Sequence, residues 1–113
     1  MSEIKINYEA IDRIDTASSK VTLQDCYAVF PPSEAGKASQ AAELAYQAIN
    51  KDAGAAIKLV ELIRPKLAWN VGTGHNNGGY RASIVEGRRW NDAWHNSPAE
   101  ALFFALIWWL QSE

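Results

Sequence analysis

The sequence predicts an α+β domain in which a small antiparallel sheet packs against helices. Two observations carry this prediction. Apolar residues recur at helical spacing in the middle of the chain and at its end, and two alternating runs flank a Gly/Asn-rich stretch near residue 75. The 113 residues suffice for one hydrophobic core, so 1–113 is a single domain. The predicted elements are a hairpin over about 67–86, a strand over 21–29 and helices over about 34–50, 52–64 and 97–111.

The first 30 residues predict a short helix followed by a strand. Residues 4–14 fit a strand by alternation and a helix by spacing, and we favour the helix. Over 21–29 the apolar side chains fall on one parity, interrupted by Asp25, which predicts a strand; they are Val21, Leu23, Tyr27 and Val29. Pro31 ends this strand because proline has no N–H to donate to a ladder.

Two helices are predicted between residues 34 and 64. The first follows Ser33, a residue type that caps helices, and its inner face is rich in alanine, which lets it approach a neighbour closely. The second has one apolar stripe and one wet side, and Pro65 stops it at Arg64. The alanines are Ala38, Ala41, Ala42, Ala45 and Ala48; the stripe is Ala53, Ala56, Ile57, Val60 and Ile63; the wet side is Lys58, Glu61 and Arg64.

The hairpin is predicted from its alternating strands and its turn residues. A type I′ turn favours Asn-Gly at its centre, and Asn77-Gly78 lies between the two runs. Because one face of each run is apolar, the turn and the hydrophobic pattern agree on a register. That register pairs Val71 with Ile84, Thr73 with Ala82 and His75 with Tyr80.

The final helix begins at Ser97, where a capping box with Glu100 and a proline at the first helical position coincide. It is apolar all round, so one face against the sheet cannot bury every side chain. Either the N-terminal helices cover its other face or a second subunit does, and the second case predicts a homodimer. The candidate interface residues are Phe103, Phe104, Trp108 and Trp109.

Two segments resemble the phage ABA sandwich domain. Residues 52–71, DAGAAIKLVELIRPKLAWNV, are similar to its Ala-rich helix that ends in a proline and leads into a Trp-containing strand, and residues 97–110, SPAEALFFALIWWL, are similar to its final helix. The first 30 residues match no pattern of that family, and residues 88–96 are more basic and aromatic than expected. The resemblance implies a sheet between helical layers and a phage origin, and it carries no catalytic residue over.

Charge and cysteine usage narrow the classes of partner and compartment. A net charge of −2 gives no overall attraction to nucleic acid or to an acidic membrane, but residues 64–96 hold five cationic side chains against two acidic ones. The longest apolar run, 101–110, is about half the roughly 20 residues that a membrane-spanning helix needs. One cysteine, Cys26, cannot form an internal disulfide, and we expect the cytoplasm of the host cell.

No catalytic or metal-ligating constellation is recognisable, and no cofactor is expected. A Cys–His nucleophile needs Cys26 beside His75 or His95, and the sequence does not indicate that proximity. Two histidines twenty residues apart and one cysteine match no metal-ligand spacing. The glycines near residue 75 lead into a strand, whereas a phosphate-binding loop opens a helix. We therefore expect a protein that is not an enzyme.

The candidate binding residues lie between the hairpin and the final helix. Two Trp beside two Arg and a His could stack on a ligand ring, grip phosphate or carboxylate, or form a hot spot for a protein partner. The alternative, which the usual burial of Trp favours, is that both indole rings pack under the sheet and the arginines extend to solvent. The candidates are Arg88, Arg89, Trp90, Trp94 and His95, with Arg81 from the hairpin.

The predicted function is that of a non-enzymatic phage-encoded accessory protein that binds a host protein or a small host ligand. A role in blunting a host defence system follows from the family analogy alone. The alternative is a nucleic-acid-binding protein that uses the basic and aromatic patch of residues 88–95. No association with a membrane is expected.

Overall fold

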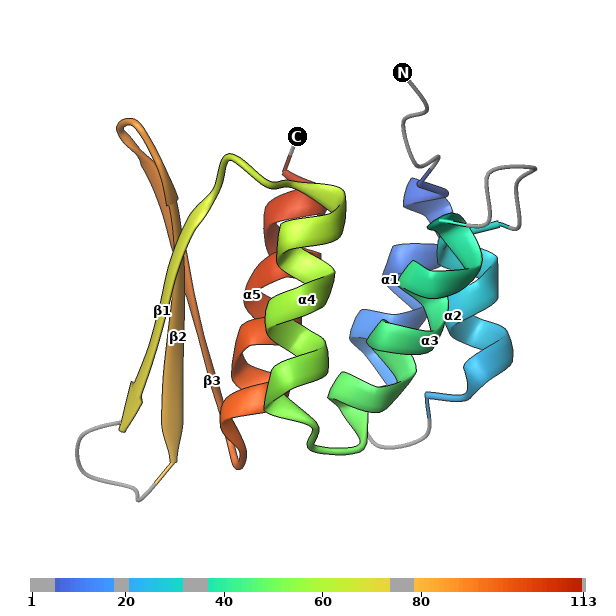
Figure 1. The fold of residues 1–113 in the computed structure, drawn as a ribbon, viewed down its shortest axis with the longest axis horizontal. Helices are drawn as coiled ribbons and strands as arrows, with labels where there is room; N and C mark the ends of the chain where they lie inside the picture. Colours follow the sequence, from blue (N-terminus) through green and yellow to red (C-terminus); the bar gives the residue numbers. More distant parts are fainter. Residues whose placement is uncertain (1–5, 18–20, 32–36, 74–78, 113) are drawn as a thin grey trace.

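The computed structural model describes residues 6–17, 21–31, 37–73 and 79–112, which form five helices and three strands. Figure 1 shows three layers: the sheet, then the pair α4 and α5, then the group α1, α2 and α3. The predicted α+β class is confirmed. The elements are α1 (Tyr8–Ala17), α2 (Leu23–Val29), α3 (Lys37–Ile49), α4 (Ala53–Ile63), β1 (Ala68–Thr73), β2 (Tyr80–Glu86), β3 (Arg89–His95) and α5 (Pro98–Gln111).

The helices lie on one side of the sheet. Among the described elements α5 alone packs its backbone against the strands, and α4 and the N-terminal helices lie beyond it (Figure 1). The expected sheet between two helical layers is therefore not what the described residues form. One face of the sheet therefore has none of the described helices over it.

The predicted helices of the middle and end of the chain are confirmed over the described residues; the predicted start of the first one after Ser33 lies outside the described residues. Asp52 caps α4 by accepting a hydrogen bond from the Ala55 N–H, and Ser97 caps α5 by accepting one from the Glu100 N–H. The favoured helical reading of the N-terminal segment is also confirmed, displaced to Tyr8–Ala17. None of the described helices is long and apolar enough to cross a membrane.

The prediction of a strand over 21–29 is wrong, because Leu23–Val29 forms helix α2. Thr22 accepts a hydrogen bond from the Asp25 N–H, and the Asp25 carboxylate accepts one from the Thr22 N–H, which completes a capping box. Cys26, Val29 and Phe30 are all fully buried, and their spacing suits a helix as well as the alternation suited a strand. The start signal at Thr22 decides between the two.

The strands form an antiparallel sheet in the order β1-β2-β3. The predicted β1–β2 pairing is confirmed, but its predicted register is wrong by two residues: Val71 lies opposite Ala82, and Thr73 lies opposite Tyr80. A shift of two keeps every side chain on its own face, so the hydrophobic pattern accepts both registers. The predicted turn at Asn77-Gly78 and the predicted partner His75 lie outside the described residues.

Residues 89–95 form the third strand, where a connection between hairpin and helix was expected. Gly87 and Arg88 link β2 to β3, and Gly87 has a φ of 63° while Arg88 keeps a negative φ. Glycine at the first central position with this pattern of φ angles is typical of a type II′ hairpin turn. The side chains of residues 89–95 are therefore positioned by a sheet.

Helix α5 is at the centre of the core. It contacts α1, α3, α4 and all three strands, so the chain itself covers both sides of this helix. Phe103, Phe104 and Trp109 are between 0 and 2% exposed, which leaves Trp108, at 37%, as the only one of the four predicted interface residues that solvent reaches. The structure therefore gives no support to a homodimer through the first three, because their side chains are already buried within one chain.

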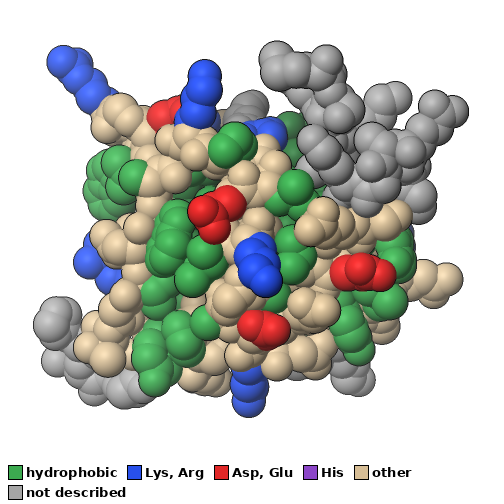
Figure 2. Space-filling model, in the orientation of Figure 1, with side chains coloured by type: hydrophobic (Ala, Val, Ile, Leu, Met, Phe, Trp, Pro, Cys, Tyr) green, Lys and Arg blue, Asp and Glu red, His purple; other side chains and the backbone are tan. Residues whose placement is uncertain are grey.

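Helix α3 contributes small side chains to the core, and α4 keeps charged side chains on its solvent side. Ala41, Ala42, Ala45 and Ala48 of α3 are fully buried, as the alanine-rich inner face predicted, and the side chain of the fifth predicted alanine, Ala38, lies outside the described ones. Figure 2 shows hydrophobic side chains gathered between the strands and the helical layer, and charged side chains over the solvent side of α4, where Lys58 and Glu61 are exposed. The predicted wet side of α4 is confirmed at Lys58 and Glu61, whereas Arg64, at the end of the helix, is only half-exposed.

Candidate functional site: the outer face of the sheet

The two faces of the sheet differ because side chains alternate along each strand. Ala82, Ile84 and Ala93 point toward α5 and are fully buried. We call the opposite face the outer sheet face. Its three cross-strand rows are Ala68–Val85–Trp90, Asn70–Ser83–Asp92 and Gly72–Arg81–Trp94.

The outer sheet face exposes two tryptophans. Trp90 is 64% exposed and Trp94 is 58% exposed, the two highest values among the large hydrophobic side chains described. They lie four residues apart on one strand, so about 13 Å of strand separates them. The alternative in which both rings pack under the sheet is therefore wrong.

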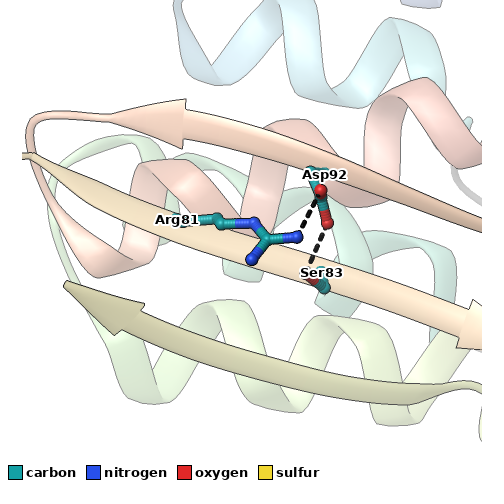
Figure 3. Close-up of polar contacts among 3 residues, drawn as sticks. All are labelled: Arg81, Ser83 and Asp92. Atoms are coloured by element: carbon teal, nitrogen blue, oxygen red, sulfur yellow. Dashed lines mark hydrogen bonds and ion pairs between the residues drawn. The ribbon is translucent and has the colours of Figure 1, made fainter. Parts of the chain in front are cut away.

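Arg81, Ser83 and Asp92 form a polar cluster (Figure 3), and the Ser83–Asp92 row lies between the rows that hold Trp90 and Trp94. Arg81 Nη2 is 2.6 Å from Asp92 Oδ2, and Ser83 Oγ donates a 2.5 Å hydrogen bond to Asp92 Oδ1. The Asp92 side chain is 9% exposed, whereas that of Arg81 is 48% exposed. Arg81 Cζ also lies 5.6 Å from the centre of the Trp94 ring, so one guanidinium joins the carboxylate and an exposed indole.

The environment of Asp92 keeps its carboxyl ionised. Burial by itself raises the pKa of this carboxyl, but the hydrogen bond from Ser83 and the hydrogen bond and positive charge of Arg81 outweigh it, and the pKa lies below its ordinary value. At neutral pH the cluster is therefore a carboxylate and a guanidinium that cancel in charge. The centre of the outer sheet face is polar and electrically neutral.

Arg89 belongs to the inner side of the sheet. Its Nη2 donates hydrogen bonds to Trp109 O at 3.0 Å and to Ser112 Oγ at 2.5 Å, and its Cζ lies 4.0 Å from the centre of the Trp109 ring. A cation at the last carbonyls of a helix interacts favourably with the helix dipole. Arg89 thus holds the end of α5, whereas its neighbour Arg88 is exposed in the turn.

His95 is also an inner residue. Its ring stacks on Phe104, with 4.4 Å between the ring centres and 11° between the planes. Its Nδ1 lies 3.9 Å from Glu100 Oε2, in the first turn of α5. Of the six predicted binding residues, Arg81, Trp90 and Trp94 therefore share the outer sheet face, Arg88 lies at its border, and Arg89 and His95 anchor α5.

The structure gives no support to a cysteine nucleophile. Cys26 is fully buried on α2, and burial, together with the negative charge of Asp25, raises the pKa of its thiol to about 12. Helix α2 contacts α1 and α3 and none of the three strands, so Cys26 and His95 are not brought together. His75 lies outside the described residues, and in the part of the chain that is described no three His, Cys, Asp or Glu side chains gather as a metal ion would require.

Ser83 and Asp92 are the residues of the site that sequence reasoning missed. The signal for Asp92 was the alternation of Trp90, Asp92 and Trp94 with the smaller inner residues Asn91 and Ala93, which the expectation of a loop concealed. Comparison with known proteins adds no relative: no family model, curated protein or solved structure matches the chain. The geometry of the outer sheet face therefore carries the functional argument.

Proposed function

We propose that this protein is a non-enzymatic binding protein whose outer sheet face, centred on Trp90 and Trp94, holds a protein partner. The observation that carries the proposal is the exposure of two tryptophans on the same face of one strand, at 64% and 58%. Tryptophan and arginine are the residue types enriched at interface hot spots. The sheet holds the backbone of both tryptophans in a fixed relation, so little ordering of the backbone opposes binding.

Charge favours a protein partner over nucleic acid. The positive charge of Arg81 is cancelled by Asp92, and Arg89 is engaged at the end of α5 on the other side of the sheet. Arg81, Arg88 and Arg89 are all exposed, but only Arg88, in the turn beside the site, lies outside these two sets of contacts. Binding to a phosphate backbone needs a cationic groove along which the strand can lie, and this neutral centre lacks that character.

The finer identity of the partner rests on the sequence resemblance of residues 52–71 and 97–110 to the phage ABA sandwich domain alone, since the described residues do not form the sheet between two helical layers that it implies. It makes the favoured partner a host protein, met in the host cytoplasm by a phage-encoded accessory protein. A small host ligand held between the indole rings is the second form of the same proposal. A counter-defence role depends wholly on this family analogy.

The test is affinity capture from host cytoplasm with a matched set of variants. The Trp90→Ala/Trp94→Ala double variant removes both exposed rings, and Tyr46→Ala removes an exposed aromatic ring from α3, 36% exposed, as the control. We expect the captured partner to be lost with the double variant and kept with Tyr46→Ala. In titration with the purified partner, each Trp→Ala change should weaken binding by about 30-fold, the value of a hot spot of about 2 kcal/mol.

Salt dependence separates a protein partner from nucleic acid. Nucleic-acid binding would weaken steeply with added salt and fall in an Arg88→Ala/Arg89→Ala variant. Such a result, with no protein captured, would replace the proposal by the nucleic-acid alternative. Capture that is identical for the wild type and the Trp90→Ala/Trp94→Ala variant would remove the outer sheet face as the binding site.

A further inference from the structure

Strand β3 has a free edge. It is the last strand in the order β1-β2-β3, and among the described elements it contacts only β2 and α5. A strand at the edge of a sheet presents a row of backbone N–H and C=O groups that can pair with another strand. The free edge of β3 lies next to the two exposed tryptophans.

The turn fixes which residues direct their backbone groups to this edge. In a hairpin closed by two residues the flanking pair, here Glu86 and Arg89, is a hydrogen-bonded pair, and such pairs then alternate along the ladder. Residues 89, 91, 93 and 95 therefore direct their N–H and C=O groups toward β2. Trp90, Asp92 and Trp94 direct theirs to the free edge, the same residues whose side chains lie on the outer sheet face.

The outer pattern of β3 is the same read in either direction: Trp90, Asp92, Trp94. In a two-fold interface, when a residue i of one copy contacts a residue j of the other, residue j of the first copy also contacts residue i of the second. A strand whose side-chain pattern is palindromic therefore matches a second copy of itself. We propose that a second copy of this chain pairs with β3 in antiparallel orientation about a two-fold axis at Asp92, which makes one continuous sheet of both copies. Trp90 of each copy then lies opposite Trp94 of the partner subunit, which gives two equivalent tryptophan pairs.

The side chains of the outer sheet face suit this register. Aromatic pairs directly across two strands stabilise a sheet, whereas like charges opposite each other destabilise it. Asp92 meets Asp92 of the partner subunit, but each carboxylate is turned toward its own β2, where Ser83 and Arg81 bind and neutralise it (Figure 3).

The other edge of the sheet lacks this self-complementarity. Strand β1 places Ala68, Asn70 and Gly72 on the outer sheet face. By the same alternation, Trp69, Val71 and Thr73 direct their backbone groups to the free edge of β1, and neither set of three reads alike in both directions or pairs two aromatic rings across a two-fold axis. The palindrome therefore assigns the dimer contact to β3.

This inference goes beyond the proposed function and stands independently of it. Edge pairing uses the backbone of β3 and leaves the outer sheet face uncovered, so a dimer presents the two tryptophan pairs side by side. Partner capture tests the face, and oligomeric state tests the edge. Either proposal can fail while the other holds.

Light scattering with edge variants is the first test. The wild type should be a dimer at micromolar concentration. Trp94→Pro removes an N–H aimed at the free edge, at a position where an edge strand tolerates proline, and should raise the dimer dissociation constant by about 30-fold or more. Trp94→Val keeps the N–H and loses the ring, so its dimer should be weakened less. A monomeric wild type at several hundred micromolar, or a folded Trp94→Pro variant that dimerises like the wild type, would overturn the proposal.

Cross-linking tests the register and does not depend on the folding of the proline variant. Chains with Trp90→Cys are mixed with chains carrying Trp94→Cys. In the mixed dimer the two cysteines lie directly opposite each other, with Cα atoms about 5.5 Å apart, which is within the range of a disulfide. Oxidation should cross-link the mixture and neither variant alone. Cys26 is fully buried with a thiol pKa of about 12 and does not compete. Equal cross-linking of each variant alone, or none in the mixture, would contradict this register.

Discussion

Two arginine–tryptophan pairs lie on opposite faces of the same sheet, and they have different roles. Arg89 Cζ lies 4.0 Å from the ring centre of Trp109, which is 1% exposed, and on the other face Arg81 Cζ lies 5.6 Å from that of Trp94, which is 58% exposed. The first pair fastens α5 to the sheet, and the second presents an indole to solvent. Composition alone does not separate the two pairs. Strand parity does, because it decides which face each residue joins.

The largest expected effect is the difference in the free energy of unfolding between alanine variants of Trp109 and Trp94. Trp109→Ala leaves a cavity in the core and should lower the free energy of unfolding by about 3–5 kcal/mol. Trp94→Ala, on the outer sheet face, should change it by less than about 1 kcal/mol. Urea unfolding of both variants measures the difference, and equal losses would mean that the two faces are not energetically distinct.

Asp92→Asn tests the polar cluster of the outer pair. It removes the ion pair with Arg81 and should cost about 2 kcal/mol at neutral pH, as expected for a hydrogen bond to a charged group. The folded-state pKa of Asp92 is lowered, so its stabilisation is present above the ordinary aspartate pKa, about 4, and is lost as pH falls through the folded value. Urea midpoints at pH 7, 5 and 3 should show a constant gap between wild type and variant down to about pH 5 and a smaller gap at pH 3. An unchanged gap at pH 3 would contradict this role.

Arg89→Met tests the inner pair against its neighbour in the sequence. The variant keeps most of the apolar stem but loses the hydrogen bonds to Trp109 O and Ser112 Oγ, which should cost about 1.5 kcal/mol. Arg88→Met is the matched control, because Arg88 is exposed in the turn, and should change stability by less than about 0.5 kcal/mol. Thermal unfolding of both proteins measures the contrast, and equal shifts would deny Arg89 a structural role.

Gly87→Ala tests the turn that holds both pairs in register. No atom lies within 4 Å of the Cβ that alanine would add, so the cost comes from the φ of 63° and should be about 1 kcal/mol. Gly72→Ala, in β1, also meets no atom within 4 Å and has no positive φ, so it should cost nothing or stabilise slightly. Chemical unfolding of both variants measures the cost of placing alanine at a positive φ. An equal change in stability in both variants would mean that the turn is not strained for alanine.

The sequence predicted those elements whose ends carry side-chain signals. Ser97, Pro98 and Glu100 place the start of α5, and Pro65 together with the apolar stripe bounds α4. The prediction of a strand over 21–29 overlooked the same kind of signal at Thr22 and Asp25 and followed the alternation of the apolar residues instead. Local capping therefore predicted these helices better than periodicity over seven residues.

The candidate site could be predicted only in part. Residue types singled out Trp90, Trp94 and Arg81, but the burial usual for tryptophan argued against their exposure. Exposure follows from the parity of β3, and that parity depends on the two-residue turn at Gly87. Predicting the partners of Asp92 would have required the β2–β3 register, which places Ser83 opposite Asp92 and Arg81 in the next row.

The central position of α5 has a consequence for how the chain is made. A ribosome builds a protein from its N-terminus, so α5 emerges after each of the elements it holds together. Until residues 98–111 are available, the inner face of the sheet and the apolar sides of α1, α3 and α4 lack their common partner. Folding during synthesis must wait for this helix, and a chain halted before Pro98 is expected to be a substrate for chaperones or proteases.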